Sequence, residues 1–354
     1  MKNWLHQLVA PFRGPAVSAA ASPRTHGPAA GPRGSVPPPA TLAPPAAPVA
    51  PVVAGGIEVA FFAWMVERSV DLQAPLGARE DQALLQLDRL AADTDAHGTL
   101  LPRAAAVVPR LLAQLRGPAG SLSELSQQVS RDVTLVAEVI RMANSATYRR
   151  RAAVVELEQA IRVLGIDGLR FAIARAVLKP LMDGRGGELS TRAARRLWQH
   201  TDCKAQLAAA LARSAGLDAF DGYLLALVHN AVWSAVLRTM DSIQPGAAPW
   251  CFSAGFVREL GTRRDRLFGV VARQWQLTDD LTRVAAEVAQ HGLAAVGSSA
   301  PVRLLRVGDH LASLLCARDG ATATALAEPL LASLHAGVRQ CYLALAQPPH
   351  DTTP

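Results

Sequence analysis

The sequence predicts an all-α protein, in which a multi-helix bundle follows a disordered linker rich in proline and alanine. Beyond residue 56, apolar residues recur every three to four positions, which is the spacing of one helical face. Capping residues precede several of these stretches, and the alternation typical of strands is missing. With 354 residues, 50% of them hydrophobic and 18% charged, the chain can bury one large core or two modest ones.

The N-terminal 56 residues are expected to lie outside the folded core. Residues 13–56 contain eleven of the 24 prolines and no acidic residue, a composition that predicts a disordered linker. Residues 1–12 form a short amphipathic segment that is marginal as an isolated helix, so we expect it to be frayed, with at most a weak contact to a membrane surface or a partner. Its apolar face consists of Trp4, Leu5, Leu8, Val9 and Phe12.

Residues 57–97 predict a helical lead-in to the main domain. Val59, Phe62 and Val66 share one helical face, and residues 79–92 form a second amphipathic stretch. We expect both helices to pack on the main domain, but the sequence leaves open whether they belong to it or act as a separate docking element. The remaining boundaries are a main domain over 98–320, a C-terminal helix within 321–347 and a disordered tail over 348–354.

The stretch 121–170 carries the densest helix signals in the chain. Ser121 and Glu124 form a capping-box pattern that begins one helix. Asp132 stands where the N-cap of a second helix belongs, and Asn144 with Ser145 ends that helix, since asparagine tolerates the left-handed conformation common at helix ends. A third helix is predicted from about 157 to 164, with Gly165 as its stop.

Further helices are predicted downstream, over about 167–182, 190–216 with Ser190 as the cap, 223–237, 266–275, 278–290, from 301 onward, and 325–345. The apolar stretch 223–237 contains His229 and Asn230 and is shorter than the roughly twenty residues that a spanning helix needs. It therefore predicts a buried core helix. The N-terminus also lacks the apolar run of a secretory signal, and we expect a cytoplasmic protein.

Charge and cysteine content give weaker indications. The net charge of +7 suggests an anionic partner, yet only Lys2, Lys179 and Lys204 are lysines. A GC-rich coding sequence produces the same arginine-rich, alanine-rich composition without selection for binding, and we favour this interpretation. The four cysteines lie far apart with no C-x-x-C pair, which predicts reduced thiols and no zinc site.

The run RDVTLVAEVIRMANSATY, followed by LEQAIRVLGIDGLR, resembles the core signature of the HDOD family of bacterial regulatory proteins. Val133 departs from it, because the family usually has proline there. The resemblance extends more loosely from about residue 100 to 315, and it implies a helical bundle that acts in signal transduction. The residues that carry the signature are Asp132, Asn144, Ser145, Tyr148, Leu164 and Gly165.

The HDOD family is in turn related to the HD phosphohydrolases, whose histidines and aspartates hold metal ions over a phosphate. The resemblance places His200, His229 and Asp309 at three of these positions, with Asn230 at the fourth, where the hydrolases have aspartate. An amide oxygen is neutral and a weaker ligand for a hard cation than a carboxylate. We therefore expect a degenerate site without metal or other cofactor.

A second departure supports the same interpretation. Where many HDOD proteins carry a His-His pair, the chain aligns Val288 and Ala289, with His291 offset nearby. Hydrolysis is thus not expected, and His200 and His229 are interpreted as hydrogen-bonded core histidines, with ligand binding as the alternative. A carboxylate from elsewhere in the chain beside the two imidazoles, with a cation between them, would contradict this interpretation.

Two other hypotheses remain. Residues 122–141 have the cadence of a helix-turn-helix, but the second helix opens with apolar residues that cannot reach base edges, so nucleic-acid binding is not favoured. Arginine clusters could instead contact a small anionic ligand or protein partners, and we expect a non-catalytic signalling module that uses such contacts. The candidate contacts are Arg149, Arg150, Arg151, Arg195, Arg196, Arg263 and Arg264.

Overall fold

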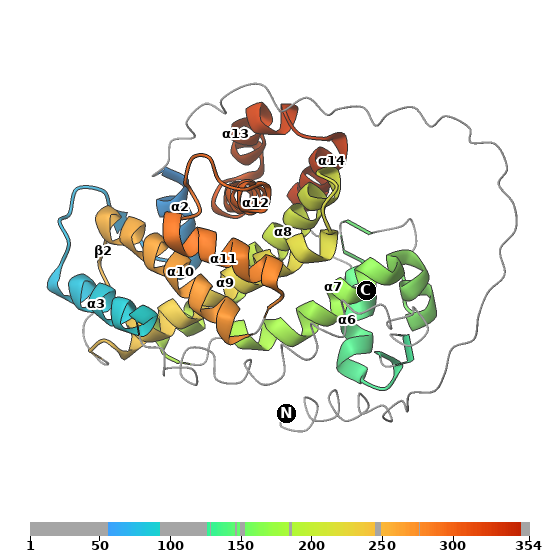
Figure 1. Cartoon of the computed structure of the whole chain (residues 1–354), viewed down its shortest axis with the longest axis horizontal. Helices are drawn as coiled ribbons and strands as arrows, with labels where there is room; N and C mark the ends of the chain where they lie inside the picture. Colours follow the sequence, from blue (N-terminus) through green and yellow to red (C-terminus); the bar gives the residue numbers. More distant parts are fainter. Residues whose placement is uncertain are drawn as a thin grey trace, which may run out of the picture. The chain divides into compact units, whose positions relative to one another are not determined.

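The computed structural model describes residues 56–92, 126–127, 129–145, 147–148, 153–183, 186–244, 249–275 and 277–347. Within these ranges the protein is all-α, which confirms the predicted fold class, and its strands are two pieces of two residues each (Figure 1). The predictions for 1–12, 13–56 and 348–354 lie outside the described residues, apart from Gly56.

The helices are named here by the labels of Figure 1. They are α2 (Gly56–Val66), α3 (Ala78–Ala92), α6 (Val133–Ala143), α7 (Leu157–Met182), α8 (Glu188–Ser214), α9 (Ala219–Ser242), α10 (Ala254–Gln274), α11 (Asp279–His291), α12 (Ala300–Ala317), α13 (Gly320–Ala332) and α14 (Ala336–Ala346).

The long helices α8 and α9 pack against each other along the middle of the bundle (Figure 1). Asp218 begins α9, because its carboxylate accepts hydrogen bonds from the amides of Phe220 at 2.7 Å and Asp221 at 3.4 Å. The helix is long and apolar enough to cross a membrane, but 89% of its apolar window is buried inside the bundle. It is the core helix that the sequence predicts.

The α6–α7 region shows what two signature residues do. Asp132 caps α6 by accepting from the amides of Thr134 and Leu135 at 2.8 and 3.2 Å. The Asn144 amide bonds both backbone groups of Val154, donating to its carbonyl at 2.7 Å and accepting from its N–H at 2.8 Å. The predicted left-handed conformation of Asn144 is wrong, since its φ is −91°. Its side chain, rather than its backbone, ties the end of α6 to the chain ten residues on.

Gly165 interrupts α7 as predicted. Its φ of 63° lies in the left-handed region that disfavours side chains, so the helix kinks there and continues to Met182. Leu164, next to the kink, is buried. The two predicted helices around residue 165 are therefore the two arms of one kinked helix.

The lead-in helices α2 and α3 pack on the rest of the bundle. Phe62 of α2 meets Phe252 edge to face, with ring centroids 5.0 Å apart. Strand β1 (Val70–Asp71) pairs in parallel with β2 (Phe252–Ser253). Glu80 of α3 accepts from the amide of Ser253 at 2.7 Å. These contacts join the lead-in to β2, which lies between α9 and α10.

Several helix boundaries differ from the predicted ones. Helix α10 begins at Ala254 rather than near residue 266, because the Ser253 hydroxyl accepts from the amide of Phe256 at 3.1 Å. The predicted helix 325–345 is two helices, α13 and α14, separated by residues 333–335. The second difference arises because the apolar spacing continues through the turn between α13 and α14, which spacing alone does not reveal.

The start of α8 is capped from another helix. Ser190 lies inside α8 and is not its cap, which corrects the prediction; instead Asp241 of α9 accepts from the amides of Leu189 at 2.9 Å and Ser190 at 3.0 Å. A Cβ on Gly187 would lie 2.5 Å from the Asp241 carboxyl carbon. A glycine is thus required for this close approach.

Candidate functional site

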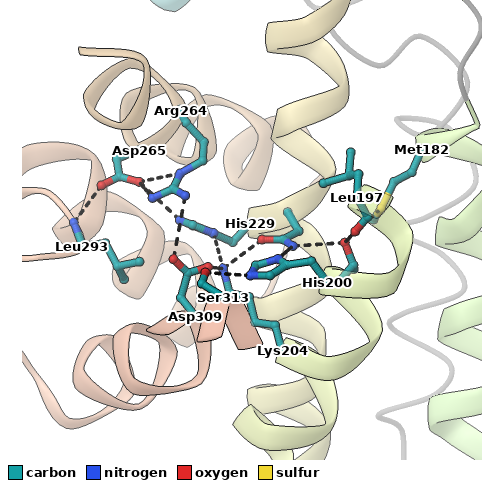
Figure 2. Close-up of polar contacts among 12 residues, drawn as sticks. Met182, Leu197, His200, Lys204, His229, Arg264, Asp265, Leu293, Asp309 and Ser313 are labelled. Carbon is teal, nitrogen blue, oxygen red and sulfur yellow. Dashed lines mark hydrogen bonds and ion pairs between the residues drawn. The ribbon is translucent and has the colours of Figure 1, made fainter. Parts of the chain in front are cut away.

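The histidines predicted from the sequence meet in the centre of the bundle (Figure 2). His200 comes from α8, His229 and Asn230 come from α9, and Asp309 comes from α12. The structure also places Lys204, Arg264, Asp265 and Ser313 among them. We call these eight side chains the Lys204 cluster.

Lys204 lies at the middle of the cluster with 0% of its surface exposed. Its Nζ is 2.6 Å from His229 Nδ1, 2.9 Å from Asn230 Oδ1 and 2.6 Å from Asp309 Oδ1 (Figure 2). An ammonium has three N–H donors and no acceptor. It donates hydrogen bonds to His229 and Asn230 and forms an ion pair with Asp309. Burial lowers the pKa of Lys204 to about 8, while Asp309 opposes this shift. The side chain is therefore charged at neutral pH.

The hydrogen bonds determine the tautomers of both histidines. His229 Nδ1 accepts from Lys204, so its Nε2 carries the proton and donates to Asp265 Oδ1 at 3.3 Å. His200 Nδ1 accepts from the Asn230 amide at 2.8 Å, so its Nε2 donates to Ser313 Oγ at 3.1 Å. Burial lowers the pKa of His200 to about 3 and that of His229 to about 4. Both imidazoles are neutral above these values.

Asn230 fits this arrangement where an aspartate would not. Its amide nitrogen donates to His200 Nδ1 at 2.8 Å and to Thr201 Oγ1 at 3.0 Å, while its oxygen accepts from Lys204. A carboxylate has only acceptors and could not donate to the unprotonated His200 nitrogen. The Asp-to-Asn difference is thus part of a network that includes the lysine.

A second ion pair borders the first. Arg264 donates to Asp265 Oδ1 at 2.9 and 3.1 Å, and its Nη1 is 4.0 Å from Asp309 Oδ2. Burial favours the neutral acid for Asp309, but Lys204 and Arg264 outweigh it and lower its pKa below the ordinary value. Burial likewise opposes ionisation of Asp265, and Arg264 lowers its pKa in turn. With neutral histidines, the two cations and two anions balance.

Helix α2 covers one side of the cluster. The rings of Phe61 and His200 lie 4.2 Å apart between centroids. Burial raises the pKa of Glu58, and the nearby Arg264 partly offsets that shift. The lead-in therefore helps to exclude water from the cluster.

The family resemblance pointed to His200, His229, Asn230 and Asp309 but not to the other members of the cluster. Where one carboxylate was expected, that of Asp309, the structure has a second, that of Asp265. The cation beside them is an ammonium of the chain. The available signal was Lys204 itself, one of three lysines and one helical turn from His200 on the same face.

The metal of the HD phosphohydrolases does not fit these residues. Lys204 Nζ stands between His229, Asn230 and Asp309, at the place from which those atoms would bind a cation. In the described part of the chain, no three His, Cys, Asp or Glu side chains lie in an arrangement that could hold a metal ion. His291 is exposed at the end of α11, while Val288 is buried.

The arginines predicted as anion contacts have different surroundings. Arg196 pairs with Glu67 at 3.1 Å, and Arg263 pairs with Asp88 at 3.0 Å. Arg195 is exposed. The prediction for Arg264 is corrected, because its buried guanidinium already faces two carboxylates inside the protein. Arg149, Arg150 and Arg151 lie outside the described residues.

The profile of the HDOD domain family matches residues 101–291, which is more than half of the chain. The chain belongs to the HDOD family. The match begins after α2 and α3 and ends with α11, so the HDOD domain includes α6 to α11 but not Asp309 and Ser313 of α12. Those two members of the Lys204 cluster come from the chain that follows it.

Similar solved structures agree with this assignment. A crystal structure of a Shewanella amazonensis SB2B protein, named "Putative metal-dependent phosphohydrolase", has a TM-score of 0.54 at 19% identity and covers 76% of this chain and 99% of its own. An HDOD domain protein with unknown function from Geobacter sulfurreducens has a TM-score of 0.51 at 19% identity, with coverage of 75% and 97%. At these identities the likeness extends to the fold alone.

A sequence relative adds little on function. An uncharacterized protein of Treponema pallidum (strain Nichols) is 23% identical over 177 residues, which are 49% of this chain and 34% of the relative. The matched part is thus about a third of the relative's length.

Proposed function

We propose that this protein is a non-catalytic regulatory module of the HDOD type, which acts through protein partners or a small anionic ligand. The observation that carries the proposal is the Lys204 ammonium, 2.6 Å from both His229 Nδ1 and Asp309 Oδ1. A cation that belongs to the chain occupies the space that a catalytic ion would need. The cluster then serves to hold four helices together.

The electrostatics support this proposal. A divalent ion would have to displace an ammonium already paired with Asp309, and would gain only neutral partners from His229 and Asn230. The ammonium would also repel it. Exclusion of metal is therefore built into the site by charge as well as by volume.

The alternative is a metal-dependent phosphohydrolase, which is the description of a structural neighbour. It predicts stoichiometric divalent metal in the purified protein and turnover of a phosphoester. The test is elemental analysis of the full chain after dialysis with Mn²⁺, Fe²⁺ or Zn²⁺, together with hydrolysis of bis(p-nitrophenyl) phosphate. We expect substoichiometric metal and no turnover; a full equivalent with turnover would overturn the proposal.

A variant makes the test sharper. The double change Lys204→Ala and Asn230→Asp removes the ammonium and supplies the carboxylate of the hydrolases, so we expect it to bind metal more tightly than the wild type. Lys179→Ala is the matched control, because this lysine lies on α7 beside Trp198, outside the cluster. If the double variant binds no more metal than this control, Lys204 is not what excludes the ion.

A further inference from the structure

A cavity separate from the Lys204 cluster opens where the turn after α6 meets α8 and α14. Its volume is about 310 Å³, at the lower end of the roughly 300–1,000 Å³ of small-molecule sites. Its lining comes from α6 and the turn after it, from α7, from α8 and from α14. The lining includes Tyr148, Phe171, Gln206, Arg213, Cys341 and Ala344.

One part of the cavity lining is apolar. It includes the buried Phe171 ring, which is stacked on Tyr223 with 4.3 Å between centroids and 12° between planes, so its orientation is fixed. The small side chains of Ala209 and Ala344 line the same cavity. A planar apolar group would suit this part of the lining.

Polar groups converge on the same space. Gln206 is already occupied, since it accepts from Thr147 and hydrogen-bonds Asp202. Tyr148, Gln340 and Arg213 line the cavity as well. The nearest carboxylate partner of Arg213 among the described residues is Asp167, at 3.9 Å, and 59% of the arginine side chain is exposed. This guanidinium can therefore pair with an added anion.

The field of Arg213 reaches into the cavity. Burial raises the pKa of Tyr148, and Arg213 opposes that shift while Asp167 adds to it. Burial also raises the pKa of the Cys341 thiol to about 12, and Arg213 again acts in the opposite sense. Arg213 thus favours negative charge at two lining residues on different elements.

We propose that this cavity binds a small molecule with a flat apolar body and one carboxylate or phosphate, with the body against Phe171 and the anion paired with Arg213. The inference deepens the proposed function, on which it rests for any signalling consequence, by locating the anionic ligand. A bound ligand would contact α8 and the signature residue Tyr148, which lie inside the HDOD match, and α14, which follows it.

Calorimetric titration of the full chain with 2-naphthoate and 2-naphthyl phosphate tests the proposal, with 2-naphthalenemethanol as the uncharged comparison. A ligand of this size in a matching pocket is expected to bind with a Kd of about 1 mM or lower. The anion that binds with the lower Kd indicates whether the natural ligand carries a carboxylate or a phosphate. Arg213→Gln is expected to weaken both anions about five- to tenfold and to leave the alcohol unchanged.

Two further variants separate the cavity from the general surface. Ala344→Leu fills the cavity from α14 and is expected to weaken all three compounds more than tenfold. Arg283→Gln is the matched control, because it removes an exposed arginine that has one carboxylate partner, on α11 and outside the cavity lining, and it is expected to leave every Kd unchanged. Circular dichroism of each variant verifies its helical content.

The proposal is overturned if neither anion binds, or if Arg213→Gln and Ala344→Leu bind them as tightly as Arg283→Gln does. Failure of the proposed function has a different signature. Stoichiometric metal and phosphoester turnover in the wild type would refute a non-catalytic module while leaving these affinities as they are.

Discussion

The replacement Lys204→Met removes the central ammonium and keeps most of the side-chain volume. The Asp309 carboxylate, whose side chain is 20% exposed, loses the partner at 2.6 Å and keeps only Arg264 at 4.0 Å. His229 Nδ1 and Asn230 Oδ1 lose their donor. Breaking a buried pair on one side costs about 3–5 kcal/mol. Because a domain is typically stable by only about 5–15 kcal/mol, we expect a large fall in the free energy of unfolding.

The assay is urea unfolding followed by circular dichroism at pH 7, applied to a double-mutant cycle. Asp309→Asn alone leaves the Lys204 ammonium without its anion and is also expected to destabilise by several kcal/mol. The combined variant removes both charges, so its loss should fall short of the sum of the two single losses by about 2 kcal/mol or more. Lys179→Met is the control and should unfold near the wild-type midpoint.

The result that would refute this reasoning is additivity. If the two single losses simply add, Lys204 and Asp309 do not depend on each other. If Lys204→Met costs less than about 1 kcal/mol, the ammonium is not a structural part of the core. Either result would also weaken the argument that this charge excludes metal.

Three further predictions follow from the same structure. Burial lowers the pKa of His200 to about 3 and that of His229 to about 4. The free energy of unfolding should therefore be retained above pH 6.5 and should fall by about 3 kcal/mol for each histidine as the pH falls towards 4. Urea unfolding at a series of pH values measures this loss. Asn144→Ala should cost about 1–3 kcal/mol, measured in the same way, because it leaves buried backbone groups unpaired. Gly187→Ala should lower the Tm, whereas Gly320→Ala, with open space around its Cβ, should not.

The controls for these predictions differ. His291→Gln tests the acid sensitivity, since an exposed histidine should leave the pH profile unchanged. A flat stability profile between pH 6.5 and 4 would mean that the two cluster histidines protonate without cost. For Asn144, a loss below about 0.5 kcal/mol would show that water replaces the two bonds to Val154.

The Lys204 cluster has a physical consequence for the HDOD fold of this chain. Charges withdrawn from water are costly unless each has a partner. Here Lys204 pairs with Asp309, and Arg264 pairs with Asp265. These four residues come from α8, α10 and α12, so any rearrangement of those helices would separate buried charges. The central bundle is therefore expected to move as a unit, with adjustment confined to its edges.

The sequence predicted the features that depend on residues close together along the chain. The all-α class, the Asp132 cap and the break at Gly165 depend on neighbouring residues and on backbone preferences, so spacing and residue type predicted them. The resemblance also identified His200, His229, Asn230 and Asp309 as one site. A cap that comes from another helix leaves no local signal in the sequence. The carboxylate of Asp241 in α9, which caps the start of α8, is an example.

The tertiary structure alone decided what the site contains. Lys204 and His229 are 25 residues apart, and His200 and Ser313 are 113 apart. The family resemblance pointed to the two histidines but to neither Lys204 nor Ser313. The sequence thus determined a helical bundle with a family signature and a missing aspartate. Only the packing of α8, α9, α10 and α12 placed an ammonium among the remaining ligands, because the partners of a buried charge are set by neighbours in space rather than in sequence.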